Sequence, residues 1–214
     1  MPRKRSKLTK SECAKIFDIF ADTINPQPEL NWQTPLDLLI AVVLSAQTTD
    51  IAVNKVTAKL WKVCRQPQDY LDLGVQKIEA MVRSIGLYRN KSKAIIGICE
   101  QLIADFAEEV PNNRDELMKF PGVGRKTANV VLNVVFKQPV MAVDTHVFRV
   151  SNRLGLVKTK TPDATEQALL KLIPKHHLLH AHHYLILHGR YTCKARNPQC
   201  HECKISNLCL FNQA

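Results

Sequence analysis

The apolar residues of this chain fall into short runs at helical spacing, and caps or prolines separate one run from the next. An N-cap threonine precedes proline at the first helical position in two places, Thr34-Pro35 and Thr161-Pro162. Proline is tolerated at this position because the backbone N–H there makes no hydrogen bond within the helix. No stretch sustains the strict alternation of apolar and polar residues that is typical of a half-buried strand. The sequence therefore predicts an all-α protein of roughly ten helices with short connectors.

Other helix starts depend on a single capping residue. Ser11 is the expected N-cap of a helix over Lys10–Thr23, and Asp50 is the expected N-cap of a helix over Ile51–Val63. A longer helix over Asn90–Phe106 is expected to turn one apolar face inward. That face consists of Ala94, Ile95, Ile98, Leu102 and Phe106.

The nine residues Phe120–Ala128, FPGVGRKTA, combine a glycine turn with the start of a helix. The two glycines let the backbone turn where a Cβ would clash. The N–H groups and the dipole at a helix start favour a bound phosphate. An ordinary turn between two helices would explain the glycines but not the adjacent Arg-Lys pair. We therefore predict a phosphate-binding turn formed by Gly122, Val123, Gly124 and Arg125.

The chain carries 30 Lys and Arg against 19 Asp and Glu, a formal charge of +11 over 214 residues. A polyanion-binding protein needs such an excess, because cations over phosphates release counterions. Charge alone is weak support, since many basic proteins bind no nucleic acid. Beside a phosphate-binding turn, it favours a nucleic-acid partner.

No targeting or membrane segment is apparent. Basic residues gather at the N-terminus, but no apolar core suited to a signal peptide follows them. The apolar run Leu38–Leu44 is too short to cross a bilayer. We expect a cytoplasmic protein whose N-terminus is a solvated basic arm rather than a nuclear address. The arm contains Arg3, Lys4, Arg5, Lys7 and Lys10.

The seven cysteines divide into two groups. Three of them are scattered among apolar helical patterns and are expected in the core: Cys13, Cys64 and Cys99. The other four form the pattern C-x6-C-x2-C-x5-C: Cys193, Cys200, Cys203 and Cys209. The odd total and the missing export signal disfavour disulfides and favour a metal site. Zinc usually takes two short knuckles and iron–sulfur clusters accept unequal loops, so the spacing leaves both metals open.

The glycine turn, the cysteine spacing and the segment Val143–His146 together resemble the endonuclease III family of DNA glycosylase/AP lyases. The resemblance extends from about Leu30 to Leu210. Three further segments resemble that family in its order: Leu44–Asp50, Ile85–Tyr88 and His188–Cys193. The resemblance implies a two-lobed helix–hairpin–helix glycosylase fold.

That fold implies three parts of the chain. Residues 1–29 would hold the basic arm and an N-terminal helix that packs with the C-terminal lobe. Residues 30–136 would form a six-helix domain with the helix–hairpin–helix, and residues 137–214 the last helices and the cluster loop. The resemblance also implies a [4Fe-4S] cluster on the four clustered cysteines. The implied partner is double-stranded DNA with damaged bases or abasic sites, bound by a monomer.

The resemblance assigns catalysis to Lys126 and Asp144. A lone lysine at a helix start would ordinarily touch phosphate, but the family's motif makes Lys126 the nucleophile that forms a Schiff base at C1′. Asp144 is expected on sequence alone to cap the helix that starts at Thr145. In the family, the matching aspartate also serves catalysis, and the two roles are compatible.

Two further residues are implied to contact DNA. Gln47 lies in a polar break between helices, and the resemblance makes it the residue that fills the gap left by the flipped nucleotide. The helix over Val75–Ile85 is expected to stop at Gly86, which would make Leu87 an apolar contact at a helix end. In the family, this leucine is a wedge that presses into the opposite strand.

Three functions compete at this point. The first is a bifunctional glycosylase/AP lyase that removes oxidised pyrimidines in base excision repair. The second is a monofunctional glycosylase for mismatched adenine or thymine, a class that typically lacks the lysine nucleophile. The third is a non-catalytic DNA-binding module, which would leave the pairing of Lys126 with Asp144 as a coincidence. The lysine favours the first.

Six histidines crowd into a short stretch near the C-terminal end. We interpret them as structural or DNA-facing rather than as a second metal site. Three of them depart from the family's pattern and have no role in this interpretation: His176, His177 and His180.

Overall fold

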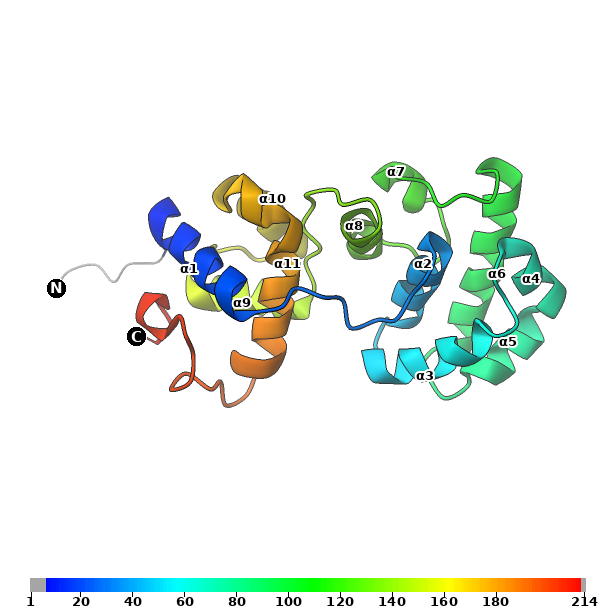
Figure 1. Cartoon of the computed structure of the whole chain (residues 1–214), viewed down its shortest axis with the longest axis horizontal. Coiled ribbons are helices and arrows are strands. Elements are labelled where there is room, and N and C mark those ends of the chain that lie inside the picture. Colours follow the sequence, from blue (N-terminus) through cyan, green and yellow to red (C-terminus); the bar gives the residue numbers. More distant parts are fainter. Residues whose placement is uncertain (1–6, 213–214) are drawn as a thin grey trace. The chain divides into compact units, whose positions relative to one another are not determined.

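The computed structural model describes residues 7–212, so Arg3, Lys4 and Arg5 of the expected arm lie outside the described residues. Across this range every regular element is helical, which confirms the all-α prediction. The chain divides into two compact units (Figure 1). Unit 1 comprises the residues up to Gln27 and those from Gln138 onward, and unit 2 is Pro28–Lys137. The sequence-based boundaries at 29/30 and 136/137 differ from these by two residues and one residue.

Unit 2 is built around one buried helix, α2, which packs on α3, α6 and α8. Leu38 and Val42 of α2 meet Val134 of α8 in an apolar cluster. Six of its helices have seven residues or more, and α7 is a single turn of four. The elements are α2 (Pro35–Leu44), α3 (Asp50–Leu60), α4 (Pro67–Leu73), α5 (Val75–Val82), α6 (Tyr88–Asp105), α7 (Arg114–Leu117) and α8 (Arg125–Val134).

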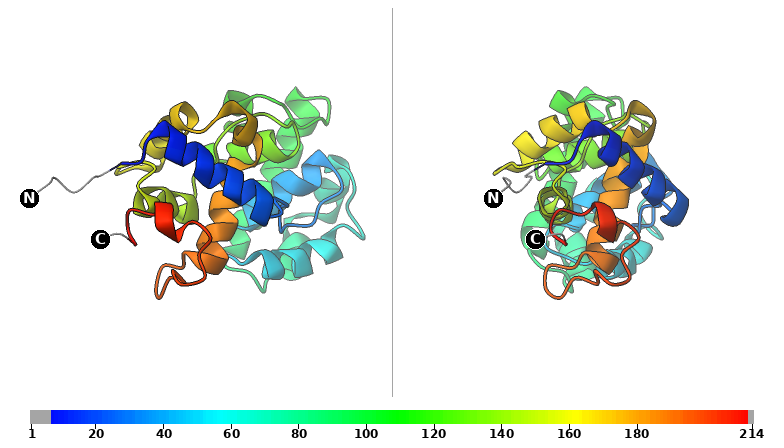
Figure 2. Two further views of the ribbon diagram at one scale, coloured as in Figure 1. Left: turned by 60° about the vertical axis from the view of Figure 1, so that its left-hand side comes forward. Right: turned by 90° about the vertical axis from the view of Figure 1, so that its left-hand side faces the viewer.

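Unit 1 joins the two ends of the described chain. Its elements are α1 (Lys10–Thr23), α9 (Thr145–Leu154), α10 (Pro162–Leu172), α11 (Leu178–Leu187), the 3₁₀ turns Lys175–His177 and Ser206–Leu208, and a π-helical turn, His188–Thr192. Helix α1 lies against α11 (Figure 2, blue and orange) and buries Ile16, Phe17 and Phe20 in the core of this unit. Leu8 N–H also donates to Gly155 O at 2.8 Å. The N-terminal helix therefore completes a core made otherwise by the last third of the chain.

Helix caps agree with the sequence where proline marks the start. Both threonine–proline pairs cap their helices through the threonine hydroxyl. The prediction of Ser11 was wrong: Thr9 caps α1 in a capping box with Glu12, at 3.2 and 2.8 Å. The prediction of Asp50 was also wrong, because Thr49 accepts the Ala52 N–H instead. In both helices a threonine one or two residues upstream makes the hydrogen bond.

Cys13, Cys64 and Cys99 are fully buried, as predicted for core residues. Burial raises the pKa of their thiols to about 12, 11 and 12 respectively. They are therefore neutral and apolar at physiological pH, unlike thiols that serve a metal.

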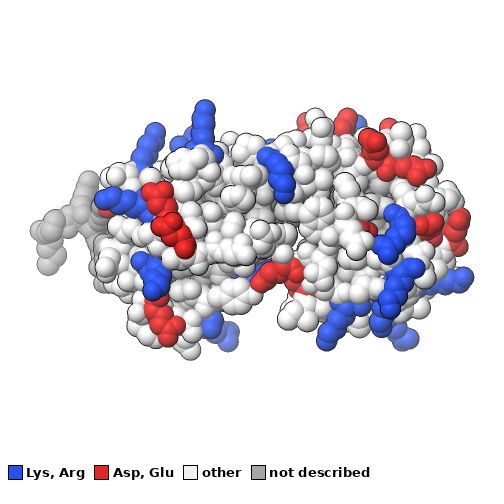
Figure 3. All heavy atoms as spheres, viewed as in Figure 1, with Lys and Arg blue, Asp and Glu red and all other residues white. Residues whose placement is uncertain are grey.

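No helix among the described residues has the length and apolarity that crossing a bilayer requires. Basic and acidic side chains are interspersed on the face shown in Figure 3. The excess of positive charge therefore does not form one continuous patch on that face.

Candidate functional site

The glycine turn between α7 and α8 has the backbone geometry that its sequence predicts. Gly122 has φ +76°, and a Cβ there would lie 3.2 Å from Ala94 Cβ and 3.5 Å from Val43 Cγ1. Gly124 is the N-cap of α8, with open space around the position of a Cβ. The first glycine thus lets the turn pack on α2 and α6, while the second leaves the start of α8 accessible.

Three expected site residues complete this turn. Val123 is buried and its N–H donates to Phe120 O at 3.1 Å, so this amide is already used within the turn. Its phosphate contact stays a prediction. Arg125 and Lys126 are the first two residues of α8 and are half-buried. Because Gly124 has no side chain to cap α8, the positive end of the helix dipole faces this turn without a capping oxygen from that residue.

Gln47 and Leu87 share an unusual backbone conformation. Both are left-handed, with φ 54° and 58°, and both side chains are exposed, Leu87 to 54%. A left-handed leucine costs about 1–2 kcal/mol relative to the right-handed form. The expected helix end at Gly86 was wrong: α5 ends at Val82, and the left-handed residue is Leu87 itself. Strain of this kind gathers at functional sites.

The loops that carry Gln47 and Leu87 lie side by side. A Cβ on Gly86 would be 3.9 Å from Gln47 O. Lys91, in the first turn of α6, donates from Nζ to Thr48 Oγ1 at 2.9 Å. Lys91 is only 5% exposed, and burial lowers its pKa. The sequence reasoning missed this lysine.

Asp144 is the N-cap of α9, as the sequence predicts. Its Oδ1 accepts the Val147 N–H at 2.8 Å, and the side chain is half-buried. Asp144 belongs to unit 1, whereas Lys126 belongs to unit 2. A joint role for the two residues in one site therefore stays a prediction.

The four C-terminal cysteines line one pocket in unit 1. Cys193 and Cys209 are buried, Cys200 and Cys203 are half-buried, and all four are free thiols. Burial raises the pKa of Cys203 and Cys209, and the nearby cysteines raise it further. Cys203 and Cys209 thus resist ionisation in the absence of a cation. Bound metal favours the thiolate form, so this set of cysteines fits a cationic centre.

Two arginines of α9 hold the start of the cysteine loop. Arg149 Nη2 donates to Gly189 O and Cys193 O at 2.8 and 3.0 Å. Arg153 Nη1 lies 3.6 Å from Cys193 Sγ and 2.7 Å from Lys194 O. Sequence reasoning missed both, although their spacing of four residues puts them on one face of α9.

Two family models match this chain. Residues 40–175 match the HhH-GPD superfamily of base excision DNA repair proteins. Residues 193–209 match the iron–sulfur binding domain of endonuclease III. The second match decides between zinc and iron–sulfur, and the cofactor is a [4Fe-4S] cluster.

Individual relatives cover nearly the whole chain. Endonuclease III of Rickettsia conorii is 52% identical over 91% of this chain and 93% of its own length. Endonuclease III of Escherichia coli K12 is 50% identical over 88% and 90%. A trapped endonuclease III–DNA covalent intermediate, solved as an estranged-adenine complex, superposes with a TM-score of 0.91 at 48% identity, covering 96% of this chain and 98% of that one. The chain belongs to the endonuclease III family, within the HhH-GPD superfamily of base excision DNA repair proteins.

Proposed function

We propose that this protein is a bifunctional DNA glycosylase/AP lyase that removes oxidised pyrimidines from duplex DNA during base excision repair. The observation that carries the proposal is the position of Lys126 in the first turn of α8, directly after a glycine turn suited to a phosphate. A backbone phosphate bound there would bring the adjacent deoxyribose within reach of this amine.

In the proposed reaction, the neutral Lys126 amine attacks C1′ of an extruded nucleotide. The glycosidic C1′–N bond breaks, and the base leaves with the electron pair and takes up a proton. Opening of the sugar ring gives a Schiff base between Nζ and C1′. Loss of a C2′ proton then expels the 3′ phosphate by β-elimination, and water releases the lysine.

Asp144 is proposed to assist this reaction, by accepting a proton and by stabilising positive charge on the sugar. Its capping bond to Val147 N–H occupies Oδ1, which leaves Oδ2 for this role. Asp144→Asn preserves a good N-cap. We expect this variant to keep its fold and its affinity for DNA but to lose most turnover, and turnover close to wild type would remove Asp144 from the site.

The remaining site residues are proposed to hold and distort the DNA. The turn formed by Gly122, Val123, Gly124 and Arg125 would grip the phosphates. Gln47 would fill the gap left by the extruded nucleotide, and Leu87 would press into the opposite strand. Their exposure and left-handed backbones support these roles, because both side chains project from adjoining loops.

The cluster ligands are proposed to be Cys193, Cys200, Cys203 and Cys209. When bound, the [4Fe-4S] cluster would cross-link the C-terminal loop. Lys194, Arg196 and Lys204 would then present their charges to the DNA backbone from a rigid loop.

Borohydride trapping tests the proposed nucleophile. Duplex DNA with one abasic site should form a covalent adduct with the wild-type protein and with Lys77→Ala, which removes an exposed lysine on α5 of the same unit. Lys126→Ala should form none. An adduct that survives in Lys126→Ala would reject this nucleophile, and the absence of any adduct with the wild-type protein would favour a monofunctional glycosylase or a DNA-binding module.

Substrate class and assembly need separate measurements. Base release from duplexes with oxidised pyrimidines should exceed release from mismatched adenine or thymine. Light scattering should give the mass of one chain for the free protein, and the mass of one chain plus one duplex for the DNA complex. We further propose that the protein works in the cytoplasm, at the nucleoid, which imaging of a fluorescent fusion would test.

A further inference from the structure

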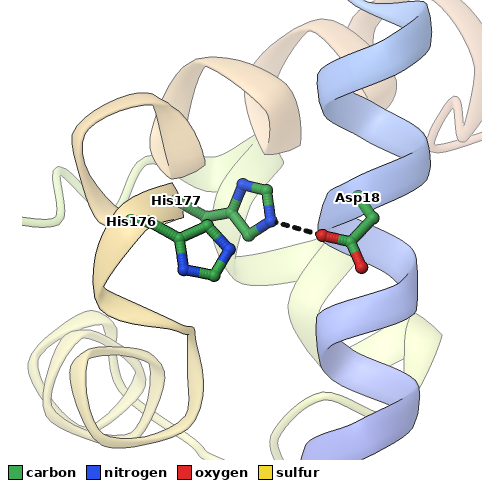
Figure 4. A group of neighbouring side chains, drawn as sticks. All are labelled: Asp18, His176 and His177. Atoms are coloured by element: carbon green, nitrogen blue, oxygen red, sulfur yellow. Dashed lines mark hydrogen bonds and ion pairs between the residues drawn. The ribbon is translucent and has the colours of Figure 1, made fainter.

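Unit 1 brings an aspartate and two histidines together on its surface, away from the cysteine loop in sequence. Asp18 lies on α1, and His176 and His177 form the end of the 3₁₀ turn that leads into α11 (Figure 4). One possible ligand atom from each of the three residues lies within 4.8 Å of the other two. The sequence showed only the histidines, because Asp18 is about 160 residues away along the chain.

We propose that Asp18, His176 and His177 form a second metal site that binds Zn²⁺. Two imidazoles and one carboxylate are a donor set that zinc accepts, with water as the fourth ligand. The proposal is independent of the reaction at Lys126, and it revises our interpretation of these histidines from sequence.

The buried histidine already has the orientation that a ligand needs. His177 Nε2 lies 2.7 Å from Asp18 Oδ1, and the His177 side chain is only 9% exposed while that of Asp18 is 60% exposed. The His177 ring also packs on Phe17, with centroids 6.0 Å apart. One nitrogen therefore points from a fixed ring toward an exposed carboxylate.

The hydrogen bond between Asp18 and His177 does not explain the orientation of the His176 ring. Adjacent residues in a helical turn ordinarily point apart. Here the His176 and His177 rings lie close together, with centroids 4.2 Å apart and planes tilted by 48°. His176 is exposed, so its ring can rotate toward a shared ion without leaving a packed core.

Only small movements are required to bind zinc. Ligand distances of about 2.0–2.1 Å in a tetrahedral site put donor atoms about 3.3–3.4 Å apart. The Asp18–His177 pair at 2.7 Å would open by about 0.6 Å as the ion replaces the shared proton. The wider separations, up to 4.8 Å, would close by rotation of the exposed His176 and Asp18 side chains.

A bound ion would tie α1 to the start of α11, both of which belong to unit 1. Ligands that bind only the folded state stabilise it by mass action. Zinc should therefore raise the unfolding temperature of the protein.

The test uses untagged holoprotein with its cluster intact, dialysed against Zn²⁺ and analysed for zinc and iron. We expect the wild-type protein to take up one zinc per chain with its iron content unchanged. His176→Ala removes the exposed ligand, and Asp18→Asn removes the charge while keeping the side-chain volume. Each should weaken zinc binding by at least about tenfold.

Two matched controls separate this site from other acidic or imidazole groups. Asp22→Asn makes the same change one turn further along α1, and His180→Ala removes an exposed histidine on α11. Both controls should bind zinc like the wild-type protein. Zinc should raise the unfolding temperature of the wild-type protein and both controls, but not that of His176→Ala.

Three results would overturn the proposal. The wild-type protein could take up no zinc, His176→Ala could bind it with unchanged affinity, or zinc could enter only as iron is lost. The last result would mean that zinc occupies the cysteine loop instead.

Discussion

Lys91 Nζ donates a hydrogen bond to Thr48 Oγ1 at 2.9 Å, and this bond links the loop that carries Gln47 to the helix that follows Leu87. Both loops belong to unit 2. Burying the Lys91 ammonium costs desolvation free energy, so its presence here suggests that the relative position of the two loops matters. We infer that Lys91 is a positioning residue for two side chains that are proposed to enter DNA together.

Lys91→Met should weaken binding to duplex DNA with a tetrahydrofuran abasic-site analogue. Without the bond, the two loops become ordered only when DNA binds, and this ordering reduces the binding free energy. We expect a reduction of about 1.4 kcal/mol, which corresponds to a tenfold loss in affinity. Thr48 keeps an acceptor in Ala46 O, so the unfolding free energy should change by less than about 1 kcal/mol. Fluorescence anisotropy and denaturant unfolding measure the two effects. Lys93→Met, an exposed lysine on the same helix, is the control and should bind normally.

Leu87 should show opposite effects on stability and on activity. Leu87→Gly removes the left-handed strain at φ 58° and should raise the unfolding free energy by about 0.5–1 kcal/mol. Leu87→Ala keeps the strain and should leave stability unchanged. Both variants lose the exposed side chain and should release damaged bases more slowly. A glycine variant with normal base release would show that this leucine does not act as a wedge.

The two glycines of the phosphate-binding turn should respond differently to alanine. Gly122→Ala forces a left-handed alanine at φ +76° and brings its Cβ to 3.2 Å from Ala94, so it should cost about 1–3 kcal/mol in unfolding free energy. Gly124→Ala meets open space and should cost less than about 1 kcal/mol, yet its Cβ would stand where a phosphate is expected. Denaturant unfolding and DNA-binding titrations distinguish the two. Equal stability of the two variants would contradict the left-handed turn.

Arg149 should control how long the protein keeps its cluster. Arg149→Met leaves Gly189 O and Cys193 O without their hydrogen-bond donor. This change should lower the stability of the loop by about 1–3 kcal/mol. We expect iron to be lost faster to a chelator, followed by the decay of the cluster's visible absorption. Lys158→Met, an exposed lysine in the same unit, should lose iron at the wild-type rate. Identical rates in all three proteins would mean that these carbonyl contacts do not retain the cluster.

The local features of the fold could be predicted because each depends on neighbouring residues. Proline after threonine located two helix starts, and glycine spacing located the turn before α8. The cysteine spacing located the metal site but did not identify the metal. Errors arose where another residue close by in the sequence could serve the same purpose. Thr9 rather than Ser11 caps α1, and α5 ends at Val82 rather than just before Gly86.

Features that depend on contacts between distant residues could not be predicted in this way. Lys91 had a usable signal, because it lies four residues before Ile95 on the buried face of α6. A lysine in that position predicts a buried partner, although not Thr48. The approach of Asp18 to His176 and His177 had no such signal. It exists only because α1 packs against segments from the far end of the chain.

This chain order has a consequence for synthesis. Ile16, Phe17 and Phe20 leave the ribosome first, but α11, against which their helix packs, follows only about 160 residues later. At ordinary translation speeds this delay is on the order of ten seconds, during which unit 2 can fold alone. The apolar face of α1 stays exposed to solvent until the nascent polypeptide is almost complete. A protein truncated before Leu178 would therefore expose the apolar face of α1, which quality-control proteases can recognise.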